Sequence, residues 1–378
     1  MKLIPREFIR ILLILISALK SGKRRRKSLF TPESGLEQQY RQIVFRKVFF
    51  LIAAVILLFV LTLYSLSHGA ASISVSEALG ALFNPESNDS FIKTVIWEIR
   101  LPRVCAALLA GAGLGLAGAV MQGILRNPLA SPFTLGISSA AGFGASLAIV
   151  LGIGIGSNSH LIIISNAFIF ALAAFVLVFF LARVRGLSPE TLILSGIAVM
   201  YLFSSMTSFL QYIATAEQLS AVVFWMMGSL SGSSWLQVSV MGVVFLISSP
   251  LLMLSAWDFN AMASGSDSAL TMGINVNRVT VVSMVISALL TASIISFTGV
   301  IGFIGLVAPH MTRMLTGGDH RFLLPSSSIS GALLLLAADT LSRNLIPPSE
   351  IPLGIMTSFI GVPFFIYILL TRRKGSIS

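Results

Sequence analysis

Two short groups of polar residues interrupt an apolar sequence and could support chemistry. Asp339 and Arg343 lie four residues apart, so one helix would bring a carboxylate and a guanidinium together. An acid inside a membrane span is typical of ion coupling, but a paired arginine would neutralise it, which favours a structural pair. The second group, QGILRNPLASP at 122–132, places an amide, an arginine, an asparagine and two prolines between apolar stretches.

The other polar residues form no known catalytic or metal-binding pattern. Four scattered histidines lack metal-site spacing, and the single Cys105 excludes an internal disulfide and a cysteine-based metal cluster. The only Gly-Lys pair, Gly22-Lys23, lacks the upstream glycine and the following Ser or Thr of a phosphate-binding loop. A G-x-S-x-G nucleophile turn is also missing. We therefore expect no catalytic residue, no metal and no cofactor in this chain.

The composition is that of an integral membrane protein. The chain has 378 residues, 56% hydrophobic and 10% charged, whereas soluble domains carry about 25% charged residues. Its net charge of +11 does not require a nucleic-acid partner, because basic residues gather on the cytoplasmic side of membrane proteins. We expect no nucleic acid and a lipid environment.

Apolar segments long enough to cross a bilayer, roughly 20 residues each, set the expected fold. They predict an all-α polytopic membrane protein with about ten transmembrane helices. The expected spans are 48–67, 101–121, 134–155, 161–182, 190–210, 236–256, 279–297, 300–315, 327–345 and 351–370. Of these, 300–315 and 327–345 are short and interrupted.

The positions of Lys and Arg predict the orientation. With a cytoplasmic N-terminus, 21 of the 25 basic residues lie inside, and Lys93, Arg100, Arg103 and Arg343 lie outside. Both termini are then cytoplasmic. Residues 1–47 form a basic segment whose apolar part, 11–19, is too short to span and is interpreted as an amphipathic surface helix. A short additional span is the alternative. Residues 373–378 form a cytoplasmic tail.

Small residues mark the expected packing surfaces. Gly111, Gly115, Gly118 and Gln122 share one helix face, which predicts close helix packing and an amide directed into the bundle. A substrate groove is the alternative for this face. A weak inverted internal repeat, five identities over 29 positions at an offset of 181 residues, pairs Leu108-Leu109 with Leu289-Leu290, Gly118 with Gly299, Pro128 with Pro309 and Gly136 with Gly317. Inverted repeats are typical of transporters.

The longest expected inner loop after the N-terminal region runs from Trp257 to Val279. Ser266 or Asp267 could cap a short helix that ends at Gly273. Two short capped helices favour a surface for another protein, with an ordinary structured connection as the alternative.

With many expected spans and no phosphate-binding loop, the chain fits a channel, a secondary carrier, or the membrane half of a transporter whose ATPase is a separate chain.

A series of motifs follows in a specific order and spacing: RLPR at 100–103, LAGAVMQGILRNPLASPFTLGIS at 116–138, GSDSALTMGINV at 265–276, GVIGFIGLVAPHMTRML at 299–315, DHRFLLP at 319–325, AADTLSR at 337–343 and EIPLGIMTSFIGVPFFIYILL at 350–370. With these motifs, the sequence resembles the FecCD family of ABC-transporter permeases, which serve iron-siderophore, haem and cobalamin import, over roughly residues 50–372. Two departures are the long N-terminal segment and Ser131, where an acidic residue is frequent.

The resemblance implies an assembly in a prokaryotic cell membrane. Residues 48–372 would be a ten-helix permease domain that pairs with a second permease subunit, identical or paralogous. Two cytoplasmic ATPases would bind ATP and Mg, and an extracellular or periplasmic protein would deliver a ferric siderophore. Haem or cobalamin is the alternative cargo. Readings from other classes are an ion-coupled secondary transporter and a non-transport sensor or scaffold.

The resemblance also implies roles for particular residues. Arg100, Arg103 and Arg343 would dock the binding protein; from the residues alone they fit interfacial snorkelling equally well. The ATPase-coupling loop would be 257–278, with Asn260, Gly265, Ser266, Asp267, Ala269, Leu270 and Gly273. The translocation pathway or gate would involve Met200, Phe203, Ser204 and Thr207, with Gln122, Asn127 and Pro128 at its inner mouth. Ordinary packing is the alternative for the pathway residues.

Overall fold

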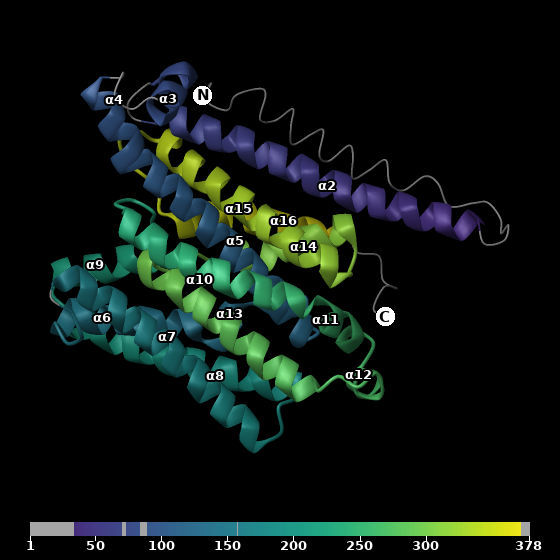
Figure 1. Ribbon diagram of the computed structural model, residues 1–378. Helices are drawn as coiled ribbons and strands as arrows, with labels where there is room; N and C mark the ends of the chain where they lie inside the picture. Colours follow the sequence, from purple (N-terminus) through teal and green to yellow (C-terminus); the bar gives the residue numbers. More distant parts are fainter. Residues whose placement is uncertain (1–33, 70–72, 84–88, 157, 372–378) are drawn as a thin grey trace.

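The computed structural model describes residues 34–69, 73–83, 89–156 and 158–371. Within these ranges the chain forms helices joined by turns, with one isolated bridge between Ile346 and Ser349. The helices, labelled in Figure 1, are α2 (Ser34–Ser67), α3 (Val75–Phe83), α4 (Ser90–Thr94), η1 (Val95–Arg100), α5 (Leu101–Ile124), η2 (Pro132–Leu135), α6 (Ile137–Leu151), α7 (Ser159–Val184), α8 (Pro189–Ile213), α9 (Ala216–Met227), α10 (Trp235–Leu254), α11 (Ala256–Ala263), α12 (Ser266–Thr271), α13 (Val276–Thr298), α14 (Ile304–Thr316), α15 (His320–Leu345) and α16 (Leu353–Thr371).

Each of the ten expected spans overlaps one of these helices, so the apolar runs located them well. Among the described residues, seven helical stretches are long and apolar enough to cross a bilayer: Gln38–Ser67, Ser90–Ile124, Ser159–Val184, Pro189–Ile213, Trp235–Leu254, Val276–Thr298 and His320–Leu345. The helices α6, α14 and α16 are not among these seven. The protein is therefore a helical membrane protein, and the count of ten spans stays a prediction.

The expected start of the ninth span, residue 327, is wrong by seven residues. The helix α15 begins at His320, where the side chain of Asp319 accepts a hydrogen bond from the backbone N–H of Arg321 at 3.1 Å. The sequence hid this start because Pro325 and a run of serines interrupt the apolar pattern. Those serines, Ser326–Ser328, are buried within the bundle.

The helices lie side by side in an elongated bundle (Figure 1). The helix α2 runs along one edge, α6, α7 and α8 lie at the opposite edge, and α5, α10 and α13 lie between them. The short helices α3 and α4 lie at one end of the bundle, and α11 and α12 lie at the other. We refer to these as the α3–α4 end and the α11–α12 end.

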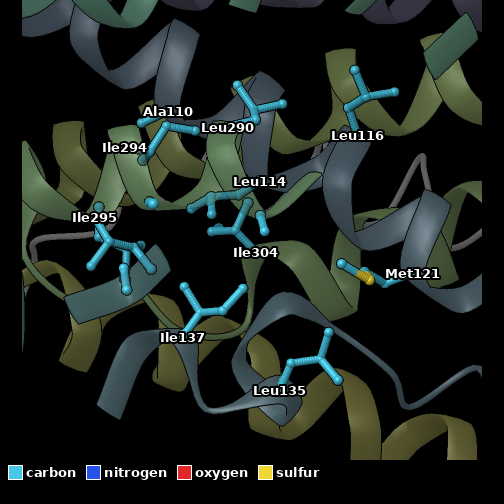
Figure 2. Packing of buried hydrophobic residues seen from close by; sticks show 14 of the residues in the cluster. Ala110, Leu114, Leu116, Met121, Leu135, Ile137, Leu290, Ile294, Ile295 and Ile304 are labelled. Atoms are coloured by element: carbon cyan, nitrogen blue, oxygen red, sulfur yellow. The ribbon is translucent and has the colours of Figure 1, made fainter. Parts of the chain in front are cut away.

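The helix α5 forms the centre of the core, and most of its residues are buried. Figure 2 shows Leu114 of α5 among Leu290 and Ile294 of α13 and Ile304 of α14. The small-residue face is a packing surface, as expected. A Cβ added at Gly111 or Gly115 would meet backbone atoms of α15, and one at Gly118 would meet the backbone of Gly305 in α14. Helix backbones that approach this closely are typical of membrane bundles.

The residue matches of the internal repeat correspond to equivalent local structure only in part. Leu108-Leu109 and Leu289-Leu290 lie inside the long helices α5 and α13, and Gly136 and Gly317 are both left-handed glycines at helix ends, but the other two pairs differ. Gly118 lies inside α5, whereas Gly299 follows the last residue of α13. Pro128 lies in a turn, whereas Pro309 lies inside α14. The expected amphipathic helix within residues 1–47 and the tail at 373–378 lie outside the described residues, apart from 34–47, which form the start of α2.

Candidate functional site

An arginine cluster occupies the α3–α4 end of the bundle. Arg103, in the first turn of α5, donates from Nε to Oδ1 of Asp339 in α15 at 2.9 Å. Its Nη1 and Nη2 donate to the two carboxylate oxygens of Glu350 at 2.7 and 2.9 Å. Nε of Arg343 lies 3.1 Å from Oδ2 of Asp339. The expected Asp339–Arg343 pair is confirmed, and Arg103 and Glu350 extend it.

Hydrogen bonds from Arg100 and Arg343 tie this cluster to the end of α2. Arg343 donates from Nη2 to Oγ of Ser65 at 2.6 Å. Arg100 donates from Nη1 to the backbone carbonyls of Leu66 and Ser67 at 2.6 and 2.9 Å. The structure thus brings Arg100, Arg103 and Arg343 together.

Burial distinguishes the members of the cluster. Arg100 and Arg103 are 4% and 7% exposed, and the side chain of Arg343 is 8% exposed. The side chain of Asp339 is fully buried, whereas that of Glu350 is 37% exposed. The expected external arginines are therefore held by groups of their own chain, and Glu350 is the member that solvent reaches most easily.

At the opposite end, the segment 257–278 forms the two short helices α11 and α12 that the sequence predicted. The expected cap of α12 is wrong: its N-cap residue is Gly265 at φ +119°, while Ser266 and Asp267 are the first helical residues. Gly273 follows the C-terminus of α12 with a left-handed φ of +82°, as expected for a glycine that ends a helix.

The predicted coupling residues divide by exposure. Ser266, Asp267, Leu270 and Gly273 are exposed, and Gly265 is partly exposed. Ala269 is fully buried, so its side chain packs inside the segment. Asn260 points to α15 instead: its Nδ2 donates to Asp319 at 2.8 Å, and its Oδ1 accepts from the backbone N–H of His320 at 2.8 Å. The Arg321 guanidinium, hydrogen-bonded to Asp319, lowers the pKa of that carboxyl well below its usual range.

The turn after α5 lies against the same end. Gln122 is buried as predicted; it donates to the carbonyl of Leu306 at 3.3 Å and accepts from Arg313 at 3.4 Å. The Asn127 side chain accepts from the N–H of Leu129 at 2.9 Å, next to Pro128 in a tight turn. Arg126 reaches across and donates to Oγ of Ser266 in α12 at 2.8 Å.

The four residues expected on the pathway do not share one environment. Phe203 and Thr207 are buried on the side of α8 that faces α6 and α7, where the Phe203 ring lies 5.7 Å from that of Phe143 and 6.3 Å from that of Phe170. Ser204 is exposed and Met200 is partly exposed. Packing therefore accounts for Phe203 and Thr207, and only the other two present atoms to a surface of the chain.

The contacts of Arg103 and Asn260 were missed from the sequence. The partners of Arg103 lie 236 and 247 residues away, and those of Asn260 lie 59 and 60 residues away. The contact between Arg103 and Glu350 could have been predicted from one feature of the sequence. Glu350 is the first residue of the EIPLG motif, on the same expected side of the membrane as Arg103.

Comparison with known proteins identifies the family of this chain. A model of the FecCD transport family matches residues 57–371. The chain belongs to the FecCD transport family. The hemin transport system permease protein HmuU of Yersinia pestis is 39% identical over 324 residues, which cover 84% of this chain and 94% of that protein. The Fe(3+)-citrate import system permease protein YfmE of Bacillus subtilis is 39% identical over 320 residues, 84% of this chain and 93% of that protein.

A solved structure supports the same conclusion. A protein described as a metal-chelate type ABC transporter, in an inward-facing conformation, superposes with a TM-score of 0.76 at 34% identity. The match covers 85% of this chain and 99% of that chain. FecCD proteins are the multi-pass permease subunits of ABC transporters and lack an ATPase site of their own. The family thus implies a complex with ATPase and binding-protein partners.

Proposed function

We propose that this chain is the permease subunit of an ATP-driven importer for ferric siderophores. The observation that carries the proposal is the pair of short helices α11 and α12, which present exposed Ser266, Asp267 and Leu270 at one end of a FecCD bundle. A surface of this kind suits a partner that supplies ATP hydrolysis. The hemin and ferric-citrate relatives favour an iron chelate as cargo. Haem or cobalamin is the alternative cargo.

The proposed assembly has two permease subunits, identical or paralogous, each with ten membrane helices and cytoplasmic termini. Two cytoplasmic ATPases bind ATP and Mg and contact the coupling segment, residues 257–278. The turn at Arg126, Asn127 and Pro128 belongs to this ATPase-facing surface, because Arg126 is hydrogen-bonded to Ser266 of α12. Ser204 and Met200 face the pathway between the two permeases.

An external binding protein would dock at the arginine cluster. Because Arg100, Arg103 and Arg343 are buried and already bound, an incoming carboxylate must compete with a group of this chain. Glu350 is the competitor that is most exposed. The proposed docking therefore involves the exchange of Glu350 on Arg103 for an acidic residue of the binding protein.

Purification from native membranes tests the assembly directly. An ATPase and an external binding protein should be recovered with the chain, and the reconstituted complex should take up ferric siderophore only with ATP and loaded binding protein. Competition with haem and cobalamin distinguishes the three cargoes. Uptake by the chain alone, driven by an ion gradient and dependent on Asp339, would instead establish a secondary transporter. Full uptake by cells that lack the chain would point to a sensor or scaffold.

A further inference from the structure

The helix α15 is attached to the coupling segment by a compact polar contact. Asn260 of α11 uses both ends of its amide: Nδ2 donates to Oδ1 of Asp319 at 2.8 Å, and Oδ1 accepts from the backbone N–H of His320 at 2.8 Å. The ring nitrogen Nδ1 of His320 lies 2.9 Å from the same Oδ1. His320 itself is 3% exposed. One side chain of α11 therefore fixes the first turn of α15.

A second contact lies on the same face of α11. Trp257 precedes Asn260 by three residues, so their side chains are neighbours on the helix surface. The guanidinium of Arg321 lies 4.3 Å from the centre of the Trp257 ring, within cation–π range. The same guanidinium donates to Oδ2 of Asp319 at 2.6 Å. Two residues of α11 thus hold three consecutive residues at the start of α15.

The middle of α15 packs closely against α5, backbone against backbone. A Cβ added at Gly111 would meet the backbone of Gly331, and one added at Gly331 would meet the backbone of Gly111. A Cβ at Gly115 would meet the carbonyl of Ser327. Close-packed interiors transmit displacement, so α5 and α15 are expected to move as one body.

The far end of α15 carries part of the arginine cluster. The helix has 26 residues, about 39 Å at 1.5 Å per residue. Asp339 and Arg343 lie near its C-terminus, where Asp339 accepts from Arg103 of α5. The same two helices therefore connect the coupling segment with the cluster at the α3–α4 end.

We propose that Asn260 is a positioning residue that couples movement of the coupling segment to α15, and through the α5–α15 pair to the arginine cluster. This rests on the proposed function, in which ATPases act at one end and a binding protein docks at the other. Asn260 then acts through α15 and not by touching the ATPase. Loaded binding protein would stimulate ATP hydrolysis through this link, and the loss of the link would leave unstimulated hydrolysis intact.

Exchange of the amide and the carboxylate tests the link. Asn260→Asp places a carboxylate against Asp319, and we expect binding-protein stimulation of ATP hydrolysis to fall about 5-fold or more, the lower range of allosteric coupling. The double variant Asn260→Asp with Asp319→Asn restores a donor and an acceptor between positions 260 and 319 and should regain most of the stimulation. Asn260→Ala, which adds no charge, gives the same readout if Asn260→Asp fails to assemble.

The matched control is Asn158→Ala, which removes an amide that caps α7 through a 2.9 Å bond to the N–H of Leu161. It should retain full stimulation per assembled complex. The proposal is overturned if the Asn260 variants lose stimulation only in proportion to lost complex, or if the double variant is no better than Asn260→Asp. Failure of the wild-type chain to recover or stimulate an ATPase would instead refute the proposed function.

Discussion

Removal of Asp339 should destabilise the protein strongly, because this carboxylate lies between two buried arginines. Its Oδ1 accepts from Arg103 at 2.9 Å and its Oδ2 lies 3.1 Å from Nε of Arg343. In Asp339→Ala, Arg103 keeps Glu350 and Arg343 keeps Ser65, but no carboxylate separates the two guanidinium groups. Breaking a buried ion pair by the loss of one partner costs about 3–5 kcal/mol.

Thermal unfolding in detergent, followed by tryptophan fluorescence, measures this cost. An unfolding entropy of about 2.1 cal/mol/K per residue gives about 0.8 kcal/mol/K for a chain of this length. The expected fall in Tm is therefore about 4–6 °C. The matched control is Glu350→Gln, because Glu350 is 37% exposed and Arg103 retains Asp339. Its cost should be about 1 kcal/mol or less, as for exposed ion pairs. A Tm for Asp339→Ala within 1 °C of the control would refute the reasoning.

Three further predictions concern the helix packing, the docking exchange and the coupling segment. Gly331→Ala should lower the free energy of unfolding by about 1–3 kcal/mol, because the added Cβ meets the backbone of Gly111. Gly318→Ala is the control, since its Cβ meets nothing within 4 Å. Equal Tm values for the two variants would contradict the close approach of the helices. Glu350→Gln should raise the affinity for the binding protein about 2- to 10-fold by freeing Arg103, which corresponds to about 0.4–1.4 kcal/mol of binding free energy. Unchanged or weaker binding, measured by interferometry at moderate salt, would rule out the exchange of carboxylates on Arg103. Gly265→Arg should uncouple ATP hydrolysis from uptake. Gly265 has φ +119°, a backbone conformation that strains any other L-residue by about 1–3 kcal/mol, so the arginine should distort the start of α12. A wild-type ratio of ATP hydrolysed to substrate imported would count against this role.

The helices were predictable from the sequence because lipid requires long apolar segments, and each expected span overlaps a helix. The glycine face of α5 was also predictable as a packing surface, since its period matches a helix. The helix that packs against this face could not be predicted, because nothing in the sequence around Gly111 indicates that Gly331 of α15 lies opposite. Start positions failed where buried serines and Pro325 mimic a loop, as at the beginning of α15.

Long-range polar contacts define the limit of prediction from the sequence. The pair Asp339 and Arg343 was found because its members are one helical turn apart. The third and fourth members, Arg103 and Glu350, come from distant segments, and only the packing of α5 against α15 brings them together. For the same reason, Asn260 was assigned to the surface of the coupling segment although its side chain bonds to Asp319 and His320.

The position of Asp339 also bears on the choice between transporter classes. An ion-coupled carrier needs an acid that exchanges a proton or cation with solvent during transport. Asp339 is the clearest acid inside an expected span, yet its side chain is fully buried and both of its oxygens are held by arginines. A cation bound at Asp339 would compete with Arg103 and Arg343, which also hold Glu350 and the end of α2. The residue that most favoured a secondary carrier is thus part of a structural cluster, which favours an importer driven by a separate ATPase.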